Sequence, residues 1–318
     1  MPTANLNLKA SLSSMKRIGD IVAEKANIVM TESLERAGHE PTTNAEAFED
    51  RNGYENDFLD GWKIKLPELK GEAKSDMRKL RRGGTGVELK YQNFSVIMSV
   101  SRRLPLITAV NINGEEAKKE ARISVWSFDG RLDKEDQAGD ALYDNNILDR
   151  GHMVRREDPV WGALSKKAND DTFHFTNSCP QIAGVNQVIW LGLENYVLSH
   201  AKSDDMKVNV YTGPYFHKRD MEYRDVKIPA AFWKVVAIVK EDGTPSATAY
   251  KVSQKKELSD LEFVYGKYKT FQVSIREVMK DTGLDFGALI DYDGFSHHEA
   301  GTGEVMERTL EDFSDIMI

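Results

Sequence analysis

Short apolar stretches rich in β-branched residues, separated by turn residues, recur from Phe94 onward in this 318-residue chain. They predict strands at residues 94–100, 106–112, 206–213, 231–239 and 246–252. Helical periodicity instead predicts helices over residues 184–201 and 274–283. Because these strands and helices follow one another without regular alternation, the sequence predicts an α+β fold rather than a doubly wound parallel sheet.

The helix at 274–283 has clear end signals. Ser274 and Glu277 have the spacing of a capping box, and Gly283 is a typical residue to follow the last turn. We therefore expect the helix to begin after Ser274 and to end before Gly283.

The chain is predicted to consist of three parts. Residues 1–90 form an extension, in which an amphipathic helix (10–38) precedes a polar, turn-rich connection (40–60). Residues 91–290 form the main folded domain, and residues 291–318 form an acidic C-terminal tail. The apolar face of the first helix packs against the body of the same protein, a second copy or a regulator.

The composition of the chain argues against several classes of protein. The formal charge of −8 argues against a generally basic, nucleic-acid-coating surface, so any site for a polyanion must be local. A single cysteine, Cys179, excludes an internal disulfide, and we expect its side chain to be small and buried. No apolar run is long enough to span a membrane, and the N-terminus lacks the apolar region of a secretory signal. A cytoplasmic location is the expectation.

The stretch "LDRGHMVRREDP" (148–159) contains the strongest candidate for chemistry. His152 lies between a glycine and basic residues in a polar segment, and by itself it fits either a turn histidine or a general base. We expect Gly151 to give the backbone a conformation that is closed to other residues. Arg150 could hold a phosphate through charge-assisted hydrogen bonds.

Downstream of His152, three side chains offer hard oxygen donors, which Mg²⁺ prefers: Asn177, Asn186 and Glu194. On the expected helix Asn186 and Glu194 are about 12 Å apart along the axis, so direct ligation of one ion by both is disfavoured. Glu194 can instead orient a water of the metal. Singly, the asparagines also fit helix caps or turns, and Glu194 fits a solvated face. Together with His152 and Arg150, they form a set suited to phosphodiester hydrolysis.

These segments resemble the DNA/RNA non-specific endonucleases of the ββα-metal group, also called His-Me finger nucleases. The resemblance rests on "DRGH" and "FTNSCPQIAGVNQVIWLGLE" (175–194), and covers roughly residues 94–286. Three further segments recur there in the same order, "VYTGPYF", "IPAAFWKVV" and "FQVSIREVMKDTGLDF". The resemblance implies a ββα-metal nuclease fold, with a central antiparallel sheet flanked by helices, for residues 91–290.

The resemblance also implies roles for individual residues. It makes His152 the general base, Asn186 the only direct protein ligand of the metal and Glu194 the holder of a metal water. Arg150 and Asn177 would be phosphate-site residues. A further arginine of the family corresponds best to Arg122, although Arg102 and Arg103 compete for that place.

The implied activity is Mg²⁺-dependent cleavage of DNA and RNA that leaves 5′-phosphates, with Mn²⁺ as a substitute metal. A homodimer and a regulatory or inhibitory protein partner are further expectations. Other interpretations stay open, namely a catalytically silent nucleic-acid-binding module and a partner-activated nuclease with a narrower substrate range. The spacing between His152 and Asn177 suggests an inserted turn at 162–171. The glycine-rich "KLRRGGTG" (79–86) fits either a mobile loop or a phosphate site.

Overall fold

The computed structural model describes residues 40–182, 191–254 and 270–310. The expected helix at 10–38 and the residues Asn186 and Trp190 lie outside these ranges. Within them, no helix combines the length and the apolar character needed to cross a membrane.

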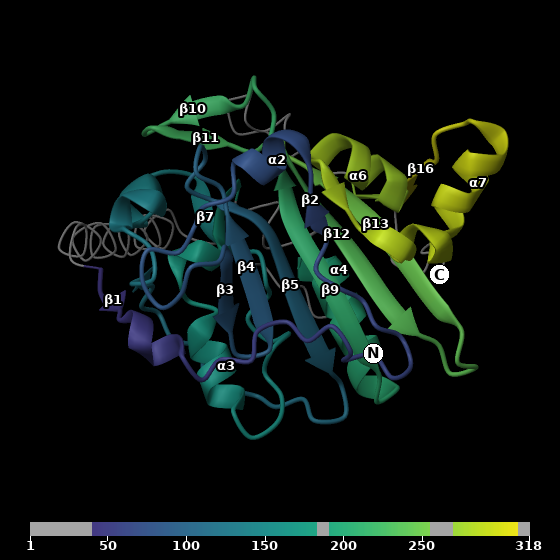
Figure 1. Ribbon diagram of the computed structural model, residues 1–318, viewed down its shortest axis with the longest axis horizontal. Helices are drawn as coiled ribbons and strands as arrows, with labels where there is room; N and C mark the ends of the chain where they lie inside the picture. The colour runs from purple at the N-terminus through teal and green to yellow at the C-terminus, as the bar shows by residue number, and fades with distance from the viewer. Residues whose placement is uncertain (1–39, 183–190, 255–269, 311–318) are drawn as a thin grey trace, which may run out of the picture.

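An eight-stranded sheet forms the centre of the molecule, and each neighbouring pair of its strands is antiparallel (Figure 1). In spatial order its strands are β16 (Glu307–Leu310), β14 (Thr270–Val273), β13 (Pro245–Ser253), β12 (Ala231–Val239), β9 (Lys207–Tyr215), β5 (Pro105–Asn113), β4 (Phe94–Met98) and β3 (Glu88–Tyr91). The sheet confirms the predicted α+β class and all five predicted strands.

Four short two-stranded ladders surround the sheet. They join β1 (Thr42–Thr43) with β6 (Phe128–Asp129), β2 (Glu68–Leu69) with β15 (Leu284–Asp285), β7 (Leu148–His152) with β8 (Ser178–Ile182), and β10 (Met221–Tyr223) with β11 (Val226–Ile228). The described helices are α2 (Gly71–Ser75), α3 (Ser165–Asp171), α4 (Leu191–Ser203), α6 (Ile275–Thr282) and α7 (Gly294–Thr302), with 3₁₀ turns at Ala45–Phe48, Lys134–Asp136, Asp140–Leu142, Phe175–Asn177 and Gly287–Tyr292.

The two faces of the sheet bury separate cores because side chains alternate along each strand. On β12, Phe232 and Val236 join the core that also contains Leu193 and Leu198 of α4. Trp233 and its alternate neighbours join the opposite core, with α6. One core therefore lies under β7, β8 and α4, and the other under α6 and the segment 54–69.

Helix α6 has the predicted ends. The Ser274 hydroxyl accepts a hydrogen bond from the Glu277 amide at 2.9 Å, and Gly283 adopts a left-handed φ of 72°. The Glu277 carboxylate pairs with Lys251 at 2.8 Å. Local sequence signals therefore define this helix correctly.

The predicted boundaries of the domain need correction at both ends. Tyr54, Phe58 and Leu69 are buried in the core under α6, and β3 is an edge strand of the main sheet, so residues 40–90 belong to the folded domain. At the C-terminal end β16 pairs with β14, which extends the domain to Leu310. The polar composition of these segments hid their contribution, because few apolar residues are enough to attach an edge segment to an existing core.

Candidate active site

The strands β7 and β8 and the helix α4 form a ββα arrangement on one face of the main sheet (Figure 1). His152 ends β7 and pairs with Ser178, while Gly151 pairs with Cys179. The segment between β8 and α4, which contains Asn186, lies outside the described residues. The DRGH residues on β7 and residues 178–182 of the second predicted segment are thus adjacent in space although they are separate in sequence.

Gly151 is required for a steric reason rather than the expected conformational one. It is not among the glycines with positive φ, so the backbone here is open to other residues. A Cβ at this position would lie only 2.6 Å from Gln181 Cγ and even closer to the end of that side chain. Gly151 therefore makes room for the buried Gln181 of the paired strand.

The imidazole of His152 packs between two aromatic rings. Its centroid lies 4.7 Å from that of Trp126 and 5.1 Å from that of Phe173, whose ring is perpendicular to it. His152 Nε2 is buried and has no hydrogen-bond partner within the described residues. Burial, followed by the positive charges of Arg122, Arg156 and Arg150, lowers the pKa of His152 to about 3. The ring is consequently neutral near neutral pH, with both the burial and the arginine charges disfavouring its protonated form.

Two predicted arginines flank this histidine. Arg150 pairs with Asp140 and lies 5.9 Å from the Trp126 ring. Arg122 is exposed and lies 5.7 Å from the Phe173 ring, with no salt bridge to a described residue. Each arginine thus contacts a ring that also contacts His152.

Arg102 and Arg103, the competitors of Arg122, are engaged elsewhere. Arg102 is buried and pairs with Asp220 at 2.8 Å, and Arg103 donates to the carbonyl of Asp225 at 2.7 Å. Neither is among the charges that act on the pKa of His152. The geometry therefore favours Arg122 as the additional arginine of the site.

Sequence reasoning missed Arg156. Its guanidinium binds the Asn169 side chain at 3.1 Å and Glu157 at 2.6 Å, and its charge acts on His152 more strongly than that of Arg150. Its position four residues after His152 was the available signal.

Asn177 makes hydrogen bonds to the backbone rather than the phosphate contact expected from the sequence. It is completely buried, and its Oδ1 accepts from the Val154 amide at 2.8 Å. Its Nδ2 donates to the carbonyls of Val154 and Thr172 at 3.0 and 3.1 Å. With both amide protons bound to backbone carbonyls, Asn177 has no donor left for a phosphate. It holds the backbone that follows His152.

Glu194 is buried rather than solvated. On α4 it lies 3.0 Å from the ammonium group of Lys234, which also donates to Thr212 at 3.0 Å. The carbonyl of Glu194 accepts from Arg155 at 3.0 Å. The buried Asp158 lies close enough for Glu194 to raise its pKa, but burial is the main cause of a pKa of about 7. Lys234, Arg155 and Asp158 lie in segments quoted above, but no pattern in the sequence singled them out.

The donor set fits a weakly held hard cation. Within the described residues, no group of three histidine, cysteine, aspartate or glutamate side chains could hold a metal. A site made of one amide oxygen and waters needs no such group, and Mg²⁺ commonly keeps most of its waters. The expected ligand Asn186 lies outside the described part of the chain.

Three other predictions concern features outside the proposed catalytic set. The spacing insert at 162–171 contains the helix α3 rather than only a turn.

Leu80, Gly83 and Gly86 of the glycine-rich segment line a cavity of about 470 Å³, together with Phe48 and Arg131. Arg131 is bound to Asp129 and to the carbonyl of Lys90, so this arginine is not a free phosphate clamp of the P-loop kind. Cys179 is fully buried, as predicted.

The ββα arrangement beneath an antiparallel sheet defines the fold of a ββα-metal nuclease. A solved complex of EndoG with EndoGI contains a chain of this fold, with a TM-score of 0.51 and 22% identity over 64% of this chain and 86% of that chain. The family described as DNA/RNA non-specific endonuclease matches residues 75–293. The chain belongs to this family.

The curated relatives include an uncharacterized protein and two named mitochondrial nucleases. The chain is similar to the uncharacterized protein y4fB of Sinorhizobium fredii, at 36% identity over 88% of this chain and 46% of that protein. It is also similar to human mitochondrial endonuclease G, at 32% identity over 36% of this chain and 41% of that protein. Nuclease 1, mitochondrial, of Schizosaccharomyces pombe is 28% identical over 58% of this chain and 60% of that protein. The chain spans about half the length of the curated relatives it matches.

Proposed function

We propose that this protein is a metal-dependent endonuclease that hydrolyses the phosphodiester bonds of DNA and RNA and leaves 5′-phosphates. The observation that carries the proposal is a neutral, half-buried His152, near the charges of Arg122, Arg156 and Arg150 within a ββα arrangement. Membership of the endonuclease family supports the reaction class. The arginines offer local positive charge for a polyanion in a chain whose net charge is −8.

In this mechanism His152 accepts a proton from the attacking water. Arg122 and Arg150 hold the phosphate through charge-assisted hydrogen bonds, for which the Arg150–Asp140 pair must open. Bound phosphate partly offsets the arginine charges that lower the pKa of His152, so the imidazole becomes a stronger base when substrate is present.

We assign Asn186 as the direct ligand of the metal and Glu194 as the residue that orients a water of the metal site. Mg²⁺, or Mn²⁺ in its place, supplies the positive charge that stabilises the scissile phosphate and the departing oxygen. Lys234 fixes the Glu194 carboxylate from the sheet side. Asn177 acts on the reaction by holding the backbone after His152 rather than by touching the phosphate.

Control of such an enzyme is a further part of the proposal. A non-specific nuclease located in the cytoplasm, as proposed here, would degrade the nucleic acids of its own cell. We therefore include an inhibitory or regulatory partner, and a homodimer as the active form. The solved complex of EndoG with EndoGI concerns the mechanism of EndoG inhibition, which supports a protein inhibitor for this fold.

The test incubates the purified protein with supercoiled plasmid and with single-stranded RNA, each with Mg²⁺, with Mn²⁺ and with EDTA. We expect cleavage that requires the metal and that is lost in His152→Ala. His298→Ala is the matched control, since His298 is an exposed histidine on α7, and it should cleave normally. Binding without cleavage by the intact protein would instead favour the catalytically silent module. Light scattering on the same samples measures the oligomeric state.

A further inference from the structure

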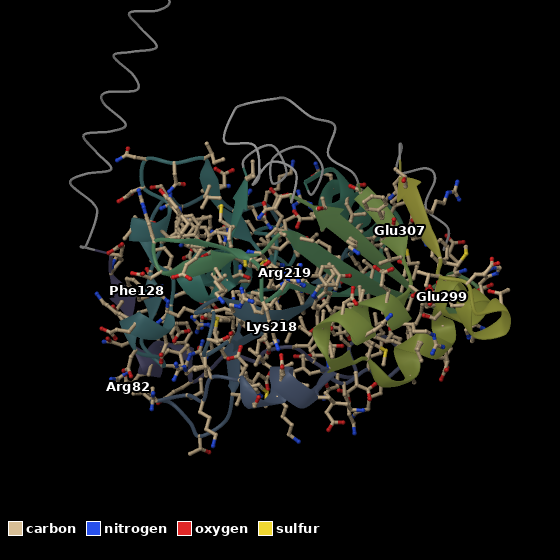
Figure 2. All side chains as sticks on the ribbon, turned by 90° about the horizontal axis from the view of Figure 1, so that it is seen from above. Arg82, Phe128, Lys218, Arg219, Glu299 and Glu307 are labelled. Atoms are coloured by element: carbon tan, nitrogen blue, oxygen red, sulfur yellow. The ribbon has the colours of Figure 1, made fainter. Side chains whose placement is uncertain are left out.

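A small aromatic cluster lies apart from the two cores of the sheet. It contains Trp126, Phe128, Phe173 and Phe175, with Ile123 packed against it. Figure 2 shows Phe128 near one end of the molecule, opposite to Glu299 and Glu307. Within the cluster the rings of Trp126 and Phe173 pack 5.5 Å apart with an interplanar angle of 68°. Both are almost fully buried, so their orientations are fixed.

This ring pair is the principal support of the His152 side chain. A catalytic histidine is usually oriented by a hydrogen bond at its second ring nitrogen. His152 Nε2 has no such partner within the described residues. Within the described part of the chain, packing therefore orients the ring, and Trp126 and Phe173 are two rings that contact it.

The same rings also contact the arginines of the site. Arg150 lies over Trp126 and Arg122 lies over Phe173, at 5.9 and 5.7 Å from the ring centroids. A guanidinium group is attracted to the face of an aromatic ring within about 6 Å. Trp126 thus links the base and one phosphate-binding cation through a single rigid side chain.

Resting on the nuclease function proposed above, we propose that Trp126 is a positioning residue that holds the His152 imidazole and the Arg150 guanidinium in fixed relative orientation. In this role Trp126 replaces the hydrogen-bonded carboxylate or carbonyl group that orients other catalytic histidines. Since it contacts neither substrate nor metal in this role, its removal affects the alignment of other groups. A misalignment of about 1 Å can reduce a rate on the order of a hundredfold.

The indole also excludes water from His152. Burial is the largest cause of the low pKa of this histidine, ahead of the charges of Arg122, Arg156 and Arg150. A smaller side chain at position 126 admits water and raises this pKa toward its ordinary value of about 6.5. The pKa of His152 in the free protein is therefore a readout of the Trp126 contact that requires no substrate.

The test compares Trp126→Leu, Trp126→Phe and Phe128→Leu. Phe128 is the matched control, because it belongs to the same cluster with similar burial but packs against Phe175. The pKa of His152 is measured by NMR titration of its ring protons in the free protein, and kcat and KM are measured on an oligonucleotide substrate. We expect Trp126→Leu to raise this pKa by about one unit or more and to lower kcat more than it raises KM. Trp126→Phe should restore most of both properties.

Phe128→Leu should reduce stability while leaving the pKa of His152 unchanged. An equal pKa shift in Phe128→Leu, or no shift in Trp126→Leu, would overturn the positioning role. If Trp126→Leu does not fold, Phe173→Leu replaces it, because Phe173 also contacts His152, and an unchanged pKa of His152 in that variant would overturn orientation by the ring pair. Failure of the wild-type protein to cleave nucleic acid would contradict the nuclease proposal alone, since the NMR titration tests the ring contact independently.

Discussion

Lys234 on β12 reaches across the sheet face to place its ammonium group 3.0 Å from Oε1 of Glu194 on α4, with both side chains buried. The alternation of β12 directs Lys234 to the same side as Phe232 and Val236, which is the side covered by α4. A buried pair of this kind contributes to a single arrangement of the site, because either charge alone would be costly in the protein interior.

We predict that Lys234→Met will lower the free energy of unfolding by about 3–5 kcal/mol, since it leaves the Glu194 carboxylate buried without its cation. The double variant Lys234→Met/Glu194→Gln should recover much of that loss. Urea denaturation at pH 7 measures both. The exposed pair Lys207–Asp60 is the control, and Asp60→Asn should change stability by less than about 1 kcal/mol. Equal losses of unfolding free energy in Lys234→Met and Asp60→Asn would contradict strong coupling in the buried Lys234–Glu194 pair.

His152 should make stability depend on pH. Its pKa of about 3 in the folded protein lies below the unfolded value of about 6.5. The unfolded chain binds the proton first as pH falls, so the contribution is complete above about pH 6.5 and is lost as pH falls toward 3. Between pH 6 and 5 the wild-type protein should lose about 1.4 kcal/mol per pH unit relative to His152→Gln. Parallel pH profiles of the two proteins would show that His152 titrates normally.

The contribution of Asp158 to stability should depend on pH in the opposite direction. Its pKa of about 7 in the folded protein lies above the unfolded value of about 3.9. The folded carboxyl retains a proton that the unfolded chain has lost, so this contribution is present below about pH 4 and is lost as pH rises to 7. Asp158→Asn should therefore gain stability relative to the wild type between pH 5 and pH 7, by about 1.4 kcal/mol per pH unit. The exposed Asp57→Asn serves as control and should show no such trend.

Gly151→Ala should destabilise the protein by about 1–3 kcal/mol through overpacking against Gln181. If the cause is steric, Gln181→Ala in the same chain should relieve the clash and restore stability, as measured by thermal unfolding. A double variant no more stable than Gly151→Ala alone would instead point to a backbone requirement at this glycine.

Arg122 and Arg150 should each contribute one phosphate contact. In a His152→Ala background, which binds without cutting, Arg122→Ala or Arg150→Ala should reduce the slope of log K against log salt concentration by about 0.7–0.9. Fluorescence anisotropy with a labelled oligonucleotide at several salt concentrations measures this slope. Arg103→Ala should leave it unchanged, because Arg103 is bound to the carbonyl of Asp225. A reduction in Arg103→Ala equal to that in Arg122→Ala would reopen the choice between these arginines.

Local signals predicted much of the architecture. The strand at 231–239 and the helix opened by Ser274 follow from side-chain alternation and capping, which depend on residues only a few positions apart. The DRGH segment and the choice of His152 also followed from sequence, through chemistry and family resemblance. By contrast, the boundary at residue 90 was wrong because edge strands and short ladders have weak patterns of their own.

The amino-acid sequence by itself determined the α+β class and the main strands, and it supplied His152 as the candidate base. Only the tertiary structure decided that Trp126 and Phe173 enclose His152, that Lys234 neutralises Glu194 and that Asn177 binds backbone instead of phosphate. The reason is that the pKa of a side chain and its hydrogen-bond partners depend on groups brought together from distant parts of the chain. Periodicity records which face of an element is buried, but it does not record which groups meet there.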